Sequence, residues 1–154
     1  MQAKNTWKLA ALGSVVLLGL GATLAYASAD DSIKARQACM KAHGASMGVM
    51  VPMIKGEKPY DNAAIQASLT AEDAACADWA KWWGADTQKG ETVETFAKAE
   101  IWTDAAGWEA ASGAWYKAYQ AVKGSADEAS FKAAFPALGA SCQGCHEKFR
   151  RPKG

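Results

Sequence analysis

Apolar residues return every three or four positions along most of the chain after residue 30, which is the period of an amphipathic helix. The clearest stretches predict helices over residues 31–55, 62–83, 104–123 and 126–149. Alternating runs of β-branched residues, which are typical of strands, do not occur in this part of the sequence. Four helices of roughly 20 residues joined mostly by short links predict an all-α fold, an antiparallel four-helix bundle.

Capping and turn residues mark where these helices are expected to begin and end. The expected N-terminal caps are Asp61 or Asn62, Thr103 or Asp104, and Ser125 within a capping box that ends at Glu128. Gly84 is expected to end the second helix. Residues 85–102 follow no clear period, and we expect a connection there with one short helical turn near residues 92–99.

The first residues have the pattern of a secretory signal peptide. Lys4 and Lys8 precede an uncharged, mostly apolar run over residues 9–24, and small residues follow it, so we expect cleavage after Ala27 or Ala29. A retained membrane anchor is the alternative, but the run is shorter than the roughly 20 residues that a spanning helix needs. The pattern predicts export to the periplasm.

Removal of residues 1–27 would leave residues 28–154 as a single domain. The segment carries two lysines and no acidic residue, so the net charge would change from +1 to −1. A chain this short excludes a large multidomain enzyme, and its near-neutral charge gives no reason to expect a nucleic-acid partner. We expect no membrane span after the signal is removed.

The most specific motif is Cys142-Gln143-Gly144-Cys145-His146 near the end of the chain. The pattern C-x-x-C-H is the attachment signature of c-type haem. Two thiols at this spacing add to the two vinyl groups of haem as thioethers, and the adjacent histidine is directed at the iron. The motif predicts one covalent haem c attached at Cys142 and Cys145, with His146 as an axial ligand of the iron.

Two other kinds of site use similar motifs. A structural zinc site needs four ligands, and the remaining Cys39, His43 and Cys76 provide no second ligand pair at zinc-like spacing. A thioredoxin-type dithiol normally opens a helix that follows a strand, whereas this motif lies near the end of a helix in an all-α chain. Both alternatives are less consistent with the sequence than haem.

The chain resembles the class II cytochromes c, the cytochrome c-prime family. The resemblance covers residues 31–152, and it is carried by Arg36-Gln37-Ala38-Cys39-Met40, by Gly56-Glu57-Lys58-Pro59-Tyr60-Asp61, by Ile101-Trp102 and by residues 142–150. Proteins of this family are four-helix bundles with the haem motif near the C-terminus. The resemblance therefore implies the same fold and cofactor that the helical pattern and the motif predict.

The resemblance also implies roles for individual residues. Met40 matches the position facing the second axial site of the iron, Arg36 matches an arginine that approaches a haem propionate, and Arg150 matches an arginine beside the proximal histidine. Low-spin members of the family place a methionine sulfur on the iron and carry electrons. Other members leave the iron five-coordinate and bind nitric oxide or carbon monoxide. His43 is a rival ligand that the family pattern does not support.

The sequence around Met40 and the turn at residues 56–61 looks more like the low-spin branch. We therefore expect an electron carrier with His146 and Met40 as axial ligands, which exchanges single electrons with redox partner proteins and transforms no substrate, so that it is not an enzyme. The alternative is a five-coordinate protein that binds nitric oxide or carbon monoxide. The resemblance is also compatible with a homodimer through the first two helices.

The two remaining cysteines are expected to pair. If the first two helices form a hairpin that turns near Lys58, Cys39 and Cys76 lie at nearly equal sequence distances from the turn and at the same height. An oxidising compartment then favours a disulfide, which would contribute about 2–4 kcal/mol. Two buried free thiols are the alternative.

Basic residues gather beyond the haem motif, at Lys148, Arg150, Arg151 and Lys153. Cations at the C-terminal end of a helix interact favourably with its dipole, which explains them without a function. A positive rim that steers an acidic redox partner to the haem edge is the functional alternative. The sequence supports both interpretations equally.

Overall fold

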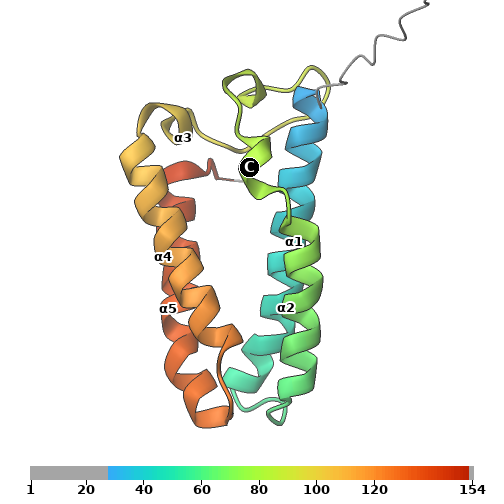
Figure 1. The fold of residues 1–154 in the computed structure, drawn as a ribbon, viewed down its shortest axis with the longest axis vertical. Coiled ribbons are helices and arrows are strands. Elements are labelled where there is room, and N and C mark those ends of the chain that lie inside the picture. Colours follow the sequence, from blue (N-terminus) through green and yellow to red (C-terminus); the bar gives the residue numbers. More distant parts are fainter. Residues whose placement is uncertain (1–27, 153–154) are drawn as a thin grey trace, which may run out of the picture.

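Two antiparallel helix hairpins form the protein (Figure 1), which a computed structural model describes over residues 28–152. The elements in chain order are α1 (Ala29–Ile54), α2 (Asn62–Cys76), η1 (Trp79–Trp82), η2 (Ala85–Thr87), α3 (Glu100–Thr103), α4 (Ala105–Lys123) and α5 (Glu128–Phe149), where η denotes a 3₁₀ helix. Helix α1 packs on α2 and α4 packs on α5. The predicted all-α four-helix bundle is confirmed. The predicted signal peptide lies outside the described residues.

Side-chain caps explain where three of the long helices begin. Asp61 and Asp104 accept hydrogen bonds from backbone N–H groups in the first turns of α2 and α4, as predicted. The predicted cap at Ser125 is wrong. Asp127 caps α5 instead, because it forms a reciprocal capping box with Ser130, whereas the Ser125 hydroxyl donates back to the carbonyl of Val122.

The second helix is shorter than predicted. It ends at Cys76 rather than at Gly84, and the chain continues through η1. This early end places Trp79 and Trp83 against Trp108 of α4, with ring centroids 6.1 and 4.7 Å from that of Trp108. The local sequence could continue the helix, but packing of these large aromatic side chains stabilises the protein more than further helical turns would.

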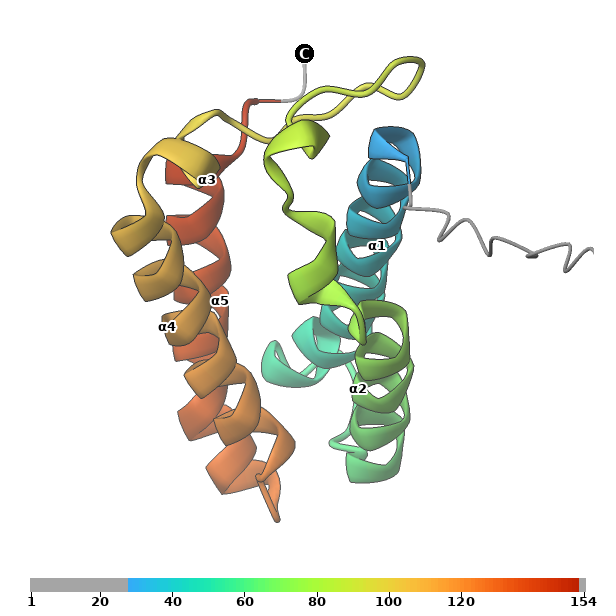
Figure 2. The ribbon, with the colours of Figure 1, turned by 45° about the horizontal axis from the view of Figure 1, so that its top comes forward.

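The connection between the hairpins crosses the end of the bundle where α1 begins and α5 ends (Figure 2). The Asp30 carboxylate accepts the backbone N–H groups of residues 91–93, which fastens the connection to the first turn of α1. Further along, the N–H of Lys98 donates to the carbonyl of Phe149 at 2.9 Å. The predicted helical turn at residues 92–99 is wrong, since the turn occurs just afterwards, in α3.

The apolar core fills the opposite end of the bundle. Its buried members are Met50, Met53, Ile65, Leu69, Ala118, Tyr119, Val122, Phe131, Phe135 and Leu138. They come from the last turns of α1 and α4 and the first turns of α2 and α5, which meet at this end (Figure 1). Within residues 28–152, every helix is too short or too polar to span a membrane.

Candidate functional site

The side chains of Cys142, Cys145 and His146 lie together near the C-terminal end of α5. Residues three and four positions apart share one face of a helix, so the motif presents its thiols and imidazole in the same direction. Both cysteines are free thiols and half-buried, and burial raises their pKa values. Burial, together with the charge of Arg150, lowers the pKa of His146. At neutral pH His146 is therefore uncharged, which is the form that binds a metal.

Two cavities adjoin this motif, with volumes of 420 and 640 Å³. Both have Met40, Cys145 and His146 in their walls, and Cys142 lines the larger one. The smaller cavity lies toward the end of the bundle that the apolar core does not fill, and the larger one reaches the core at Tyr119. Pockets for small-molecule ligands and cofactors typically measure about 300–1,000 Å³, so either space is of cofactor size.

Arg36 is the most buried charged group in the wall of the smaller cavity, with an exposed fraction of 4%. Its Nη2 donates to the carbonyl of Thr87 at 2.7 Å, and its guanidinium lies 4.6 Å from the ring centroid of Trp83. Its Nη1 is buried and has no hydrogen-bond partner within residues 28–152. Burial lowers the pKa of Arg36 to about 10, so the group remains charged at neutral pH.

Aromatic rings form much of the remaining wall. Trp79 and Trp83 lie in edge contact at 4.8 Å between centroids, and Trp108 contacts Phe149 at 5.2 Å. The Nε1 of Trp83 is buried and, like Arg36 Nη1, finds no partner among the described residues. A buried N–H without an acceptor costs about 1–3 kcal/mol, so two of them beside one cavity indicate a bound group that accepts hydrogen bonds.

Met40 and His43 are both on α1 but face different surroundings. Met40 is 37% exposed and lines both cavities. His43 lines only the larger one, and its Nε2 lies 3.3 and 3.4 Å from the sulfurs of Cys39 and Cys76. Burial lowers the pKa of His43 to about 4, with a smaller contribution from His146. The imidazole is neutral at pH 7, and its Nε2 is directed at sulfur.

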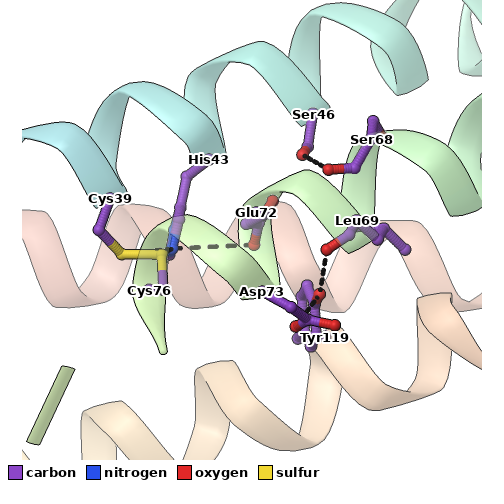
Figure 3. Close-up of a disulfide and its surroundings, with 9 residues drawn as sticks. All are labelled: Cys39, His43, Ser46, Ser68, Leu69, Glu72, Asp73, Cys76 and Tyr119. Carbon is purple, nitrogen blue, oxygen red and sulfur yellow. Dashed lines mark hydrogen bonds and ion pairs between the residues drawn. A yellow bond between two sulfur atoms is a disulfide. The ribbon is translucent and has the colours of Figure 1, made fainter. Parts of the chain in front are cut away.

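Cys39 and Cys76 form a disulfide between α1 and α2 (Figure 3), with an S–S distance of 2.03 Å and Cα atoms 5.0 Å apart. This is the pairing that the hairpin register predicts. The contacts of His43 with both sulfurs and with Glu72 were not predicted. Spacing in the sequence could have suggested that His43 lies one turn after Cys39, but nothing indicated that Glu72 is buried beside it.

The basic residues after the motif have separate partners. Lys148 pairs with Asp104, and the Arg151 guanidinium donates to the carbonyl of Thr95. Arg150 lines both cavities. Lys153 lies outside the described residues. Two of the four predicted rim charges are therefore engaged in contacts that brace the chain around the cavities.

The residues of this site fit a covalent haem. Two free thiols, a neutral imidazole and flat aromatic walls surround a cofactor-sized space, and a charged guanidinium with an unpaired N–H is suited to a propionate. Cys142, Cys145, His146 and Arg36 would hold the group. The fold and the site together define a c-type haem protein built on a four-helix bundle.

Comparisons with known proteins identify the family. Residues 31–150 match the family model described as Cytochrome C'. The chain is 32% identical over 132 residues to cytochrome c' of Alcaligenes xylosoxydans xylosoxydans, covering 83% of this chain and 99% of that protein. It is 34% identical over 131 residues to cytochrome c-556 of Rhodopseudomonas palustris, covering 81% and 86%.

Solved structures agree with this assignment. Cytochrome c' of Rubrivivax gelatinosus superimposes with a TM-score of 0.73 at 26% identity, covering 82% of this chain and 99% of that one. A ferrous variant of the Alcaligenes xylosoxidans protein with bound NO gives 0.71 at 32% identity, covering 83% and 99%. The chain belongs to the cytochrome c' family, and its cofactor is covalent haem c.

Proposed function

We propose that Cys142 and Cys145 attach the haem as thioethers and that His146 is the proximal ligand of its iron. The i, i+3, i+4 arrangement on α5 supports this assignment, as does the neutral state of the imidazole. Arg36 is proposed to pair with a propionate, supported by its unpaired Nη1. The haem supplies an iron centre that can take up one electron or bind a diatomic gas.

The function that these observations favour is binding of nitric oxide or carbon monoxide on the side of the site formed by α1. The observation that carries this proposal is that His43, the histidine on that side, directs its Nε2 at the disulfide and Glu72. The likeness to a cytochrome c' with bound NO supports it. Met40 would then screen the gas site without binding the iron.

An electron carrier is the second candidate, and the placement of Met40 favours it. The Met40 side chain lines both cavities together with His146, so its thioether is available as a second axial ligand. Relatives named cytochrome c-556 are as similar to this chain as those named cytochrome c'. In this case the sequence-based expectation of a low-spin, methionine-ligated iron would apply.

Optical spectra of the purified protein and of Met40→Ala separate the two candidates. A gas-binding protein should give a broad high-spin spectrum, bind carbon monoxide readily when reduced, and change little on substitution. An electron carrier should show a sharp reduced α-band and a sulfur-to-iron charge-transfer band, both lost in Met40→Ala. Met47→Ala is the matched control, since Met47 also lies on α1 and lines the larger cavity. A low-spin spectrum in the unmodified protein would overturn the first candidate.

We also propose that residues 1–27 direct export to the periplasm and are removed. The charged start, apolar run and small residues support this. N-terminal sequencing of the protein recovered from a periplasmic extract should begin just after Ala27 or Ala29. A protein that retains residue 1 would contradict it.

A further inference from the structure

Three atoms able to bind a metal, the sulfurs of Cys39 and Cys76 and Nε2 of His43, lie within 4.8 Å of one another between α1 and α2, in the wall of the larger cavity. His43 Nε2 lies 3.3 Å from Cys39 Sγ and 3.4 Å from Cys76 Sγ. The same nitrogen lies 3.7 Å from Glu72 Oε1 (Figure 3). We call Cys39, His43, Glu72 and Cys76 the sulfur–imidazole cluster.

The cluster is partly buried, with His43 and Cys76 half-buried, and its imidazole is held in place. Cys39 is fully buried, and the exposed fraction of Glu72 is 5%. The ring of His43 stacks on Trp115, with centroids 5.0 Å apart and planes 11° from parallel. Removing the Glu72 carboxyl and the His43 imidazole from water costs free energy, which packing alone does not explain.

The distances from His43 Nε2 to the other three atoms are close to those of a tetrahedral zinc site. With Zn–S near 2.3 Å and Zn–N and Zn–O near 2.1 Å, the edges of the tetrahedron measure about 3.4–3.8 Å. The three edges that meet at His43 Nε2, at 3.3, 3.4 and 3.7 Å, are close to these values. Of these four residues, only Cys39, His43 and Cys76 have ligand atoms that all lie within 4.8 Å of one another, so the Glu72 carboxylate has to move toward the sulfurs to become the fourth ligand. The S–S edge is far shorter, at 2.03 Å, because it is a covalent bond. The disulfide therefore prevents a metal ion from binding between the two sulfurs.

We propose that the sulfur–imidazole cluster binds one Zn²⁺ ion when its disulfide is reduced. A dithiol reductant breaks the S–S bond by exchange, gives two electrons and two protons to the cysteines, and becomes a disulfide itself. Zn²⁺ then displaces the two thiol protons, together with any proton on Glu72. Two thiolates and an imidazole select zinc over calcium or magnesium, which prefer all-oxygen sites.

This site uses other residues than the proposed haem attachment, although both line the larger cavity. Its sulfurs come from α1 and α2, whereas Cys142 and Cys145 lie on α5. Cys39 is nevertheless adjacent in sequence to Met40, which lines both cavities. The proposal goes beyond the function given above and holds for either candidate role of the iron.

Zinc content measured against haem iron tests the proposal. Holoprotein is reduced with dithiothreitol under argon, freed of reagent by gel filtration, dialysed against Zn²⁺ and analysed for both metals. We expect one zinc per iron in the reduced protein and none in the untreated protein. X-ray absorption at the zinc edge, which is separate from the iron signal, should then show two sulfur ligands with nitrogen and oxygen.

Two variants identify the ligands. Cys39→Ser/Cys76→Ser should bind no zinc after the same treatment. His43→Phe keeps an aromatic ring against Trp115 but removes the nitrogen, and should weaken zinc binding by more than about tenfold, since even outer-shell changes cost that much. Circular dichroism follows the helices throughout.

Several outcomes would overturn the proposal. These are no zinc in the reduced protein, equal zinc in the untreated protein or in the double serine variant, a zinc shell without sulfur, or undiminished affinity in His43→Phe. Loss of the helices on reduction would also overturn it, because the ligands come from two packed helices. If His43→Phe itself does not fold, His43→Ala replaces it with the same expectation.

Discussion

Tyr119→Phe should destabilise the protein by removing a hydrogen bond that joins the two hairpins. Tyr119 of α4 is 2% exposed, and its hydroxyl lies 2.6 Å from Asp73 Oδ1 and 3.1 Å from the carbonyl of Leu69, both on α2. Asp73 also pairs with Lys123. The substitution keeps the ring in the core and deletes only the hydroxyl.

The expected magnitude follows from these contacts. A hydrogen bond to a charged acceptor contributes about 1.5–3 kcal/mol, and because the Asp73 side chain is 45% exposed we expect a value at or below the lower end of that range, about 1–2 kcal/mol. With a urea slope of about 2 kcal/mol/M, the unfolding midpoint of the ferric holoprotein should fall by about 0.5–1 M. Urea titration followed by circular dichroism measures it.

The loss should depend on pH in a defined direction. Hydrogen bonds from Lys123 and Tyr119 lower the pKa of Asp73 below its usual 3.8. The stability gained from ionised Asp73 is therefore present above pH 3.8 and disappears as the pH falls through the lower, folded-state pKa. The difference between the protein and Tyr119→Phe should shrink over the same range.

Tyr116→Phe is the matched control, because Tyr116 lies on the same helix but is 59% exposed. Its midpoint should stay within the scatter of an ordinary surface substitution, about 0.5 kcal/mol. Equal midpoints for the two variants at neutral pH would refute the assigned role of Tyr119. A difference that persists unchanged at pH 3 would refute the role of Asp73.

Two further predictions concern the ties around α1. Cys39→Ser/Cys76→Ser should lower the free energy of unfolding by about 2–4 kcal/mol, measured by the same urea titration, and an unchanged midpoint would contradict a stabilising disulfide. Asp30→Ala removes the carboxylate that accepts the amides of residues 91–93, so hydrogen exchange at these amides should accelerate while the helices keep their protection. Exchange rates that do not change there would show that other contacts hold the connection.

Much of the fold could be predicted because helical periodicity and capping are local properties. Asp61 and Asp104, each one of two caps expected from the sequence, cap α2 and α4. The early end of α2 could not be predicted, since it depends on tryptophan packing between segments far apart in the chain. Gly84 marked a plausible stop, but contacts of Trp79 and Trp83 with Trp108 end the helix sooner.

The candidate site likewise has one part that the sequence predicts and one part that it does not. The motif at residues 142–146 and the pairing of Cys39 with Cys76 follow from spacing along helices. The unpaired N–H of Trp83 and the carbonyl of Thr87 that holds Arg36 belong to the irregular connection, whose path is set by distant contacts. No periodic signal in the sequence specifies such a path.

The separation of the molecule into two hairpins has a consequence for how the protein matures. The disulfide lies wholly within the α1–α2 hairpin, and the proposed thioether bonds lie wholly on α5 of the other. Neither covalent reaction needs the hairpins to have met, so oxidation of one and cofactor attachment to the other can proceed in either order. When the hairpins then pack together around the cavities, they would bury a disulfide and thioether bonds that have already formed.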